Sequence, residues 1–134
     1  VVNVSTAPAN KTMKYSRVNG IDNVLLIRLA EMHLIRAEAY ANLNRIAESL
    51  TELNAIRKRA GLSDAAETTS AGLVNAILKE RRLEFAHEGY RWLDLRRTGR
   101  WNATGLTEDF RSRWPIPQRE VQTSAGLITQ NTGY

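Results

Sequence analysis

The chain has 134 residues, a formal net charge of +5 and a sequence pI of about 10.0, and 43% of its residues are hydrophobic. This length fits one domain or a part of a larger one. The absence of cysteine excludes disulfides, a thiolate nucleophile and cysteine-ligated metals. No apolar stretch approaches the roughly 18 residues of a membrane-spanning helix. Residues 1–20 lack the apolar core of a signal peptide, so we expect any targeting segment to lie outside this chain.

The positive charge is concentrated in one run, residues 79–100, which holds 7 basic and 4 acidic side chains. A phosphate-binding face is normally purer in sign, whereas here four carboxylates are interleaved with the basic groups. They are Glu80, Glu84, Glu88 and Asp94. The distribution therefore argues against a nucleic-acid partner.

Residues 1–20 are predicted to be irregular, and a first helix is predicted from about Asp22 to Asn42, capped by Asp22 or Asn23. This helix has two apolar flanks, Leu25, Leu29, Met32, Ala39 and Leu26, Ala30, Ala37, Tyr40. A helix that is apolar on two flanks needs neighbours on both sides. We therefore expect the chain to sit within a longer protein.

A second helix is predicted after a short turn at Asn44 and Arg45, and it runs to about Ala60, where Gly61 ends it. So short a turn makes the two helices antiparallel neighbours. The pattern is similar to a tetratricopeptide unit, through Ala37, Tyr40, Ser49, Leu53 and Ile56. An ordinary helical hairpin is the open alternative.

Residues 61–70 are predicted to form a loop, after which Thr68, Thr69 or Ser70 caps a third helix. That helix runs to Glu88 and is broken by Gly89, and a fourth spans Tyr90 to Thr98. Residues 101–134 are predicted to form an irregular tail with an extended Trp114–Pro117 segment and no helical period from Gln118 onwards. The predicted fold class is all-α, with tetratricopeptide-like hairpins over residues 21–100 of a single domain or part of one.

The charged run contains the clearest candidates for chemistry. Its four carboxylates could include a catalytic pair, but basic residues lie three positions away at Arg81–Glu84, Glu88–Arg91 and Asp94–Arg97. Residues at that helical spacing pair with each other, and paired carboxylates stay ionised and make poor general acids. We predict structural salt bridges and no catalytic residue.

Two histidines, His33 and His87, are the remaining metal-ligand candidates. Glu84 and His87 form a Glu-x-x-His pair, but a di-iron bundle needs two such motifs and two further glutamates. The motif is better explained as a chance match, and His33 as a hydrogen-bonded core histidine. The sequence assigns no metal ligand and no cofactor-binding residue.

Four aromatic side chains, those of Tyr90, Trp92, Trp101 and Trp114, could stack on a sugar or a base. Tyr90 and Trp92 flank a helix start and are expected to anchor the core, while Trp114 is expected to dock the tail. Trp101 is the one that we expect to be exposed. None of them is assigned as a ligand-binding residue.

Several motifs occur in order along the chain. The charged run supplies Glu80-Arg81-Arg82-Leu83-Glu84-Phe85, then Glu88-Gly89, Arg91-Trp92, Asp94-Leu95-Arg96-Arg97 and Gly99-Arg100. Upstream lie Leu26-Ile27-Arg28-Leu29-Ala30-Glu31, Leu34-Ile35-Arg36-Ala37-Glu38-Ala39-Tyr40, Asn54-Ala55-Ile56-Arg57 and Arg59-Ala60-Gly61-Leu62. The closing segment supplies Trp114-Pro115-Ile116-Pro117, Glu120, Thr129-Gln130-Asn131 and Gly133-Tyr134. Together, and in this order, these motifs resemble the SusD/RagB family.

The resemblance implies an α-helical, non-enzymatic lipoprotein on the outer face of the bacterial outer membrane of Bacteroidetes. Such a protein binds an oligosaccharide or a peptide and delivers it to a SusC-type TonB-dependent transporter. Members are several times longer and carry their lipid on an N-terminal cysteine, so this chain would be a C-terminal portion, with anchor and most ligand-binding aromatics elsewhere. It also implies that the charged run is an ion-pair network fastening the last helices to the tail. A stand-alone tetratricopeptide-like interaction module is the alternative.

Overall fold

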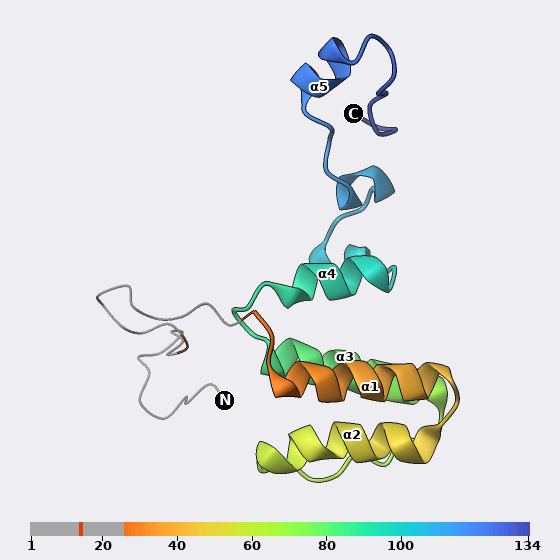
Figure 1. Cartoon of the computed structure of the whole chain (residues 1–134). Helices are drawn as coiled ribbons and strands as arrows, with labels where there is room; N and C mark the ends of the chain where they lie inside the picture. Colours follow the sequence, from red (N-terminus) through yellow and green to blue (C-terminus); the bar gives the residue numbers. More distant parts are fainter. Residues whose placement is uncertain (1–13, 15–25) are drawn as a thin grey trace, which may run out of the picture. The chain divides into compact units, whose positions relative to one another are not determined.

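The computed structural model describes residue 14 and residues 26–134, and within them it contains helices and loops but no strand (Figure 1). The predicted all-α class is confirmed. The predicted irregular lead-in and the caps at Asp22 or Asn23 lie outside the described residues. The chain divides into two compact units, one ending at Arg91 and the other spanning Trp92–Tyr134. In the described part no helix is both long and apolar enough to cross a membrane.

The first unit is built on an antiparallel hairpin of α1 (Leu29–Asn42) and α2 (Ile46–Arg59) (Figure 1). Asn44 adopts the left-handed conformation, with φ of +57°, and the backbone N–H of Arg45 donates to the carbonyl of Tyr40 at 2.8 Å. This closes the last turn of α1 and reverses the chain. Gly61 ends α2 with φ of +73°. The predicted turn and hairpin are confirmed.

The core lies where α1 meets α2 and α3 (Ser70–Glu84). Its buried apolar side chains are Ala30, Leu34, Ala37, Ala41, Leu53, Ile56, Leu73, Ile77 and Phe85. Small alanines on α1 let the neighbouring helices approach closely. Between α1 and α2 the fully buried Ser49 hydroxyl donates to the Ala37 carbonyl at 2.8 Å. Thr69 caps α3 by accepting from the N–H of Gly72, as predicted.

Two predicted helix boundaries were wrong. The first helix does not include residues 26–28, because Arg28 is extended, with φ of −129° and ψ of 151°. The third helix ends at Glu84 and not at Glu88, and the turn that follows holds His87 and Gly89 at φ of +66° and +83°. Both departures lie next to the same group of charged side chains, which competes with helical geometry for the backbone.

The second unit contains most of α4 (Tyr90–Arg97), two 3-10 turns, η1 (Trp101–Thr104) and η2 (Asp109–Ser112), and α5 (Gln118–Thr123). The prediction of no helix after Gln118 was wrong, because Pro117 presets the first turn of a helix too short to show a period. The Trp114–Pro117 segment is extended, as predicted. It is held by the Gln130 amide, which accepts from the Ile116 N–H at 2.8 Å and donates to the Ile116 carbonyl at 2.9 Å.

Candidate functional site

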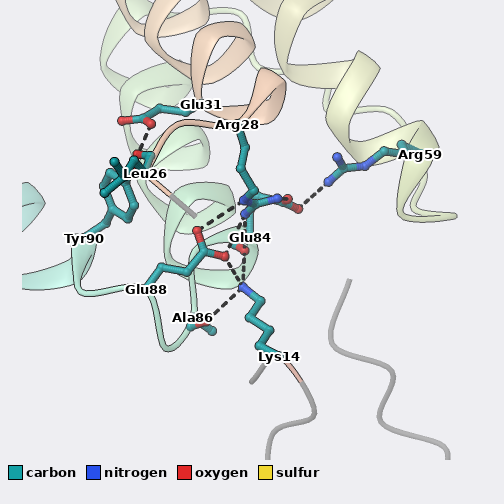
Figure 2. A network of polar contacts seen from close by, with 9 residues as sticks. All are labelled: Lys14, Leu26, Arg28, Glu31, Arg59, Glu84, Ala86, Glu88 and Tyr90. Atoms are coloured by element: carbon teal, nitrogen blue, oxygen red, sulfur yellow. Dashed lines mark hydrogen bonds and ion pairs between the residues drawn. The ribbon is translucent and has the colours of Figure 1, made fainter. Parts of the chain in front are cut away.

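The most connected polar site in the described residues surrounds the C-terminal end of α3 (Figure 2). The Arg28 guanidinium donates to Glu84 Oε1 at 2.6 Å and to Glu88 Oε1 at 2.9 Å. Arg59, at the end of α2, lies 2.6 Å from the other oxygen of Glu84. Two carboxylates thus bind cations that come from the segment before α1 and from α2, and the site joins three segments of the first unit.

Cations also satisfy the backbone carbonyls that the end of α3 leaves without helical partners. Lys14 Nζ donates to the carbonyls of Glu84 and Ala86 at 2.8 and 2.9 Å, and it lies 2.5 Å from Glu88 Oε1. Arg28 Nη2 adds a hydrogen bond of 3.0 Å to the Glu84 carbonyl. The last carbonyls of a helix carry the negative end of its dipole, so cations are favourable there. This explains why α3 stops four residues earlier than its sequence period predicts.

An aromatic pair packs beside these charges. The rings of Phe85 and Tyr90 lie 4.9 Å apart between centroids, and the guanidinium carbons of Arg28 and Arg81 each lie 5.1 Å from the Phe85 centroid. The Tyr90 hydroxyl is 2.9 Å from a carboxylate oxygen of Glu31. Burial, together with this carboxylate, raises the pKa of the Tyr90 phenol. The Arg28 guanidinium therefore lies between carboxylates and the π-face of Phe85, both of which favour a cation.

The site keeps the Glu84 carboxylate ionised. The side chains of Glu84 and Glu88 are only 6% and 2% exposed. Burial alone would raise the pKa of the Glu84 carboxyl, but hydrogen bonds from Arg59 and Arg28 outweigh it and hold that pKa below its ordinary value. A carboxylate fixed in this way neither donates a proton nor accepts one readily at neutral pH. The arrangement holds chain segments together.

The predicted salt bridges were right in kind and partly wrong in partner. Arg97 lies 2.9 Å from Asp94, as predicted. Glu84 and Glu88 do not rely on neighbours within the run, and their partners come instead from 25 to 74 residues away along the chain. Glu80 likewise binds Arg57 of α2 at 3.0 Å. Helical spacing can show only pairs of residues that are close in the sequence. The motifs that contain Arg28 and Arg59 were the sequence signal for the distant partners, and that signal was missed.

The two histidines serve no common centre. His33 Nδ1 lies 2.6 Å from Glu52 Oε2, so its predicted hydrogen bond is confirmed, although 29% of the side chain is exposed. His87 is exposed and lies in the turn beyond α3, so it does not share a helical turn with Glu84. Within residues 26–134 and residue 14, no three histidine or carboxylate side chains gather where they could hold a metal ion.

A second feature is an aromatic pocket of about 440 Å³ in the second unit. It is lined by Trp92, Arg111, Arg113, Trp114, Pro115 and Tyr134. Trp114 is 80% exposed, so its expected role in docking the tail was wrong, and the half-buried Trp101 is not the most exposed tryptophan. Tyr90 packs against the core, as predicted. Both pocket arginines already pair with nearby carboxylates, and the pocket therefore offers mainly apolar contact.

Residues 3–134 match the sequence model of the SusD family. The chain is similar to SusD-like protein P38 of Formosa agariphila, with 38% identity over 90% of this chain and 27% of that protein. It is also similar to SusD-like protein P25 of the same organism, with 29% identity over 88% of this chain and 26% of that protein. The chain therefore spans about a quarter of the length of these relatives.

Two solved structures share the fold. A SusD-like protein of Bacteroides fragilis aligns with a TM-score of 0.74 at 29% identity, over 84% of this chain and 26% of that one. A SusD superfamily protein of Bacteroides vulgatus aligns with a TM-score of 0.72 at 32% identity, over 81% of this chain and 27% of that one. Sequence and structure thus agree over most of the chain, and the chain belongs to the SusD family.

Proposed function

We propose that the protein carrying this chain is a SusD-like nutrient-binding component of the outer membrane. It binds an oligosaccharide or a peptide at the cell surface and delivers it to a SusC-type TonB-dependent transporter. The observation that carries the proposal is the family match over residues 3–134. The ion-pair network adds support, because it joins residues of three motifs that identify the family: Arg28, Arg59 and Glu84.

This chain contributes structure to the proposed function, and it does so without catalysis. The carboxylates at the end of α3 are fixed by cations, and the low pKa of Glu84 makes it unsuited to general acid chemistry. Nutrient contacts are assigned to the part of the longer protein beyond this chain, and the lipid anchor and outward-facing location also belong to that part.

A calorimetric titration tests the proposal. The full-length protein, prepared without its lipid anchor, is titrated with a panel of soluble oligosaccharides and peptides, and each mixture is then analysed for cleavage products. Saturable binding of at least one compound with no turnover is the expected result. Cleavage of a bound compound contradicts the non-catalytic role, and a complete lack of binding across both classes contradicts nutrient binding.

The same preparation separates this function from the nucleic-acid alternative. Binding to phosphate backbones weakens steeply with salt, because each neutralised phosphate releases counterions. Nutrient binding by stacking and hydrogen bonding is expected to change little between low and physiological salt. A titration with single- and double-stranded nucleic acid that shows salt-dependent affinity would support nucleic-acid binding. It would contradict the inference that carboxylates interleaved with basic residues make a poor phosphate-binding face.

A further inference from the structure

The helix α1 has a second apolar face that the described residues leave exposed. Leu29, Met32, Ile35 and Leu43 are 75%, 40%, 47% and 68% exposed, and Ala39 is exposed too. At 100° per residue these positions centre on the side of α1 opposite Ala30, Leu34, Ala37 and Ala41, which are buried against the other helices. One side of the helix thus serves the core, and its other side carries apolar groups in solvent.

The spacing on this face is that of a helix-packing seam. Leu29, Met32, Ile35, Ala39 and Leu43 follow one another at the three- and four-residue intervals by which one helix packs along another. Arg36, the polar residue that falls within the seam, is turned aside by its ion pair with Glu52 at 2.7 Å. The small Ala39 lies near the middle of the seam, where a second backbone could approach closely.

We infer that a further helix packs on this face of α1. That helix comes from the part of the same longer polypeptide that lies outside this chain. The length of the relatives favours this occupant, because the chain spans only 27% of SusD-like protein P38 and 26% of the aligned Bacteroides fragilis structure. Three quarters of such a protein are then available to cover the face. α1 packs against both α2 and α3 on its other side, so the seam is the face of α1 that remains for a further helix.

The inference rests on the family and not on the proposed ligand. It predicts that α1 is buried on both sides in the full-length protein, as the two apolar flanks of its sequence require. It also distinguishes α1 from α2, whose exposed face carries polar side chains such as Thr51 and Lys58 around the exposed Ala55. Ala39 and Ala55 are therefore a matched pair: both are exposed alanines within a helix of this chain, and only Ala39 lies on an apolar seam.

Thiol labelling tests the inference in the anchor-free, otherwise cysteine-free full-length protein. Single variants Ala39→Cys and Ala55→Cys are reacted with a maleimide under native conditions, with Met32→Cys as a second seam position if Ala39→Cys does not fold. Cys at the seam is expected to react about a hundredfold more slowly than Cys at position 55, because the reagent reaches a covered thiol only through local opening. Light scattering in the same buffer must show a monomer.

Two results would overturn the inference. Equal labelling rates at positions 39 and 55 would show that the seam stays open in the whole protein, ready for an external partner. Protection that appears only at concentrations where light scattering detects a dimer would assign the seam to a second copy. Failure of the nutrient-binding proposal would leave the labelling result unchanged, since the protection needs no ligand.

Discussion

Replacement of Glu84 by glutamine tests the ion-pair network most sharply. The substitution keeps the size of the side chain but removes the charge that both Arg28 and Arg59 bind at 2.6 Å. Breaking a fully buried ion pair costs about 3–5 kcal/mol, and an exposed pair contributes about 0.2–1 kcal/mol. Arg28 is 19% exposed, so its pair with Glu84 approaches the buried limit. Arg59 is 44% exposed, so its pair with Glu84 approaches the exposed limit.

The expected loss of unfolding free energy lies between those limits. Arg28 retains Glu88 at 2.9 Å after the substitution, which lowers the cost of its uncompensated charge. We therefore expect Glu84→Gln to destabilise the chain by about 2–3 kcal/mol. Glu48→Gln is the matched control, because Glu48 is 44% exposed and pairs with Arg45 on the surface of α2. That control should lose no more than about 0.5 kcal/mol.

Urea unfolding at pH 7, followed by far-ultraviolet circular dichroism, gives both values from the shift in midpoint at constant slope. If Glu84→Gln lowers the unfolding free energy no more than Glu48→Gln does, the network is a solvated surface and the structural role fails. A change in slope would instead mean that the substitution altered the compactness of the native or unfolded state.

Because the pKa of Glu84 is lower in the folded chain, its stabilisation is complete above about pH 4.3, the ordinary glutamate value, and is lost as the pH falls through the folded value. Urea unfolding at a series of acidic pH values should therefore show a steeper loss of unfolding free energy below about pH 4.3 for the parent than for Glu84→Gln. Parallel curves for the two proteins would contradict the lowered pKa of Glu84. Gly133→Ala should destabilise the second unit more than Gly126→Ala, since an added methyl at Gly133 would meet the ring of Phe110 while Gly126 faces open space. Thermal unfolding followed by near-ultraviolet circular dichroism compares the two variants. Equal shifts in melting temperature would count against the packing of Gly133 on Phe110. Thr69→Ala should lower the unfolding free energy by about 1 kcal/mol, because α3 loses its cap, whereas Thr69→Ser should keep the cap. Hydrogen exchange of the first α3 amides checks this, since they should stay protected in Thr69→Ser and lose protection in Thr69→Ala.

The hairpin could be predicted from the sequence because its signals are local. The turn at Asn44, the end of α2 at Gly61 and the cap at Thr69 each depend on residues within a few positions, and all three were correct. The predicted helical conformation of residues 26–28 was wrong for the opposite reason. Arg28 is extended in order to reach Glu84 and Glu88, which lie 56 and 60 residues further along the chain.

The network itself could be predicted in kind but not in detail. Close alternation of charge and apolar residues indicates buried ion pairs, because an amphipathic helix would separate the two. Partner identity depends on tertiary placement, and helical spacing points only to neighbours such as Arg97 for Asp94. Lys14 could not be found at all from local pattern, because nothing around it in the sequence marks it as a cap for the end of α3.

Co-purification from native membranes tests whether the protein works at the cell surface with a TonB-dependent transporter. The full-length protein, tagged at its C-terminus, is extracted in mild detergent and recovered by affinity. We expect an outer-membrane TonB-dependent transporter in near-stoichiometric amount, together with accessibility of the tagged protein to an impermeant label on intact cells. Recovery of the protein without any transporter, from a compartment that the label does not reach, would contradict this expectation.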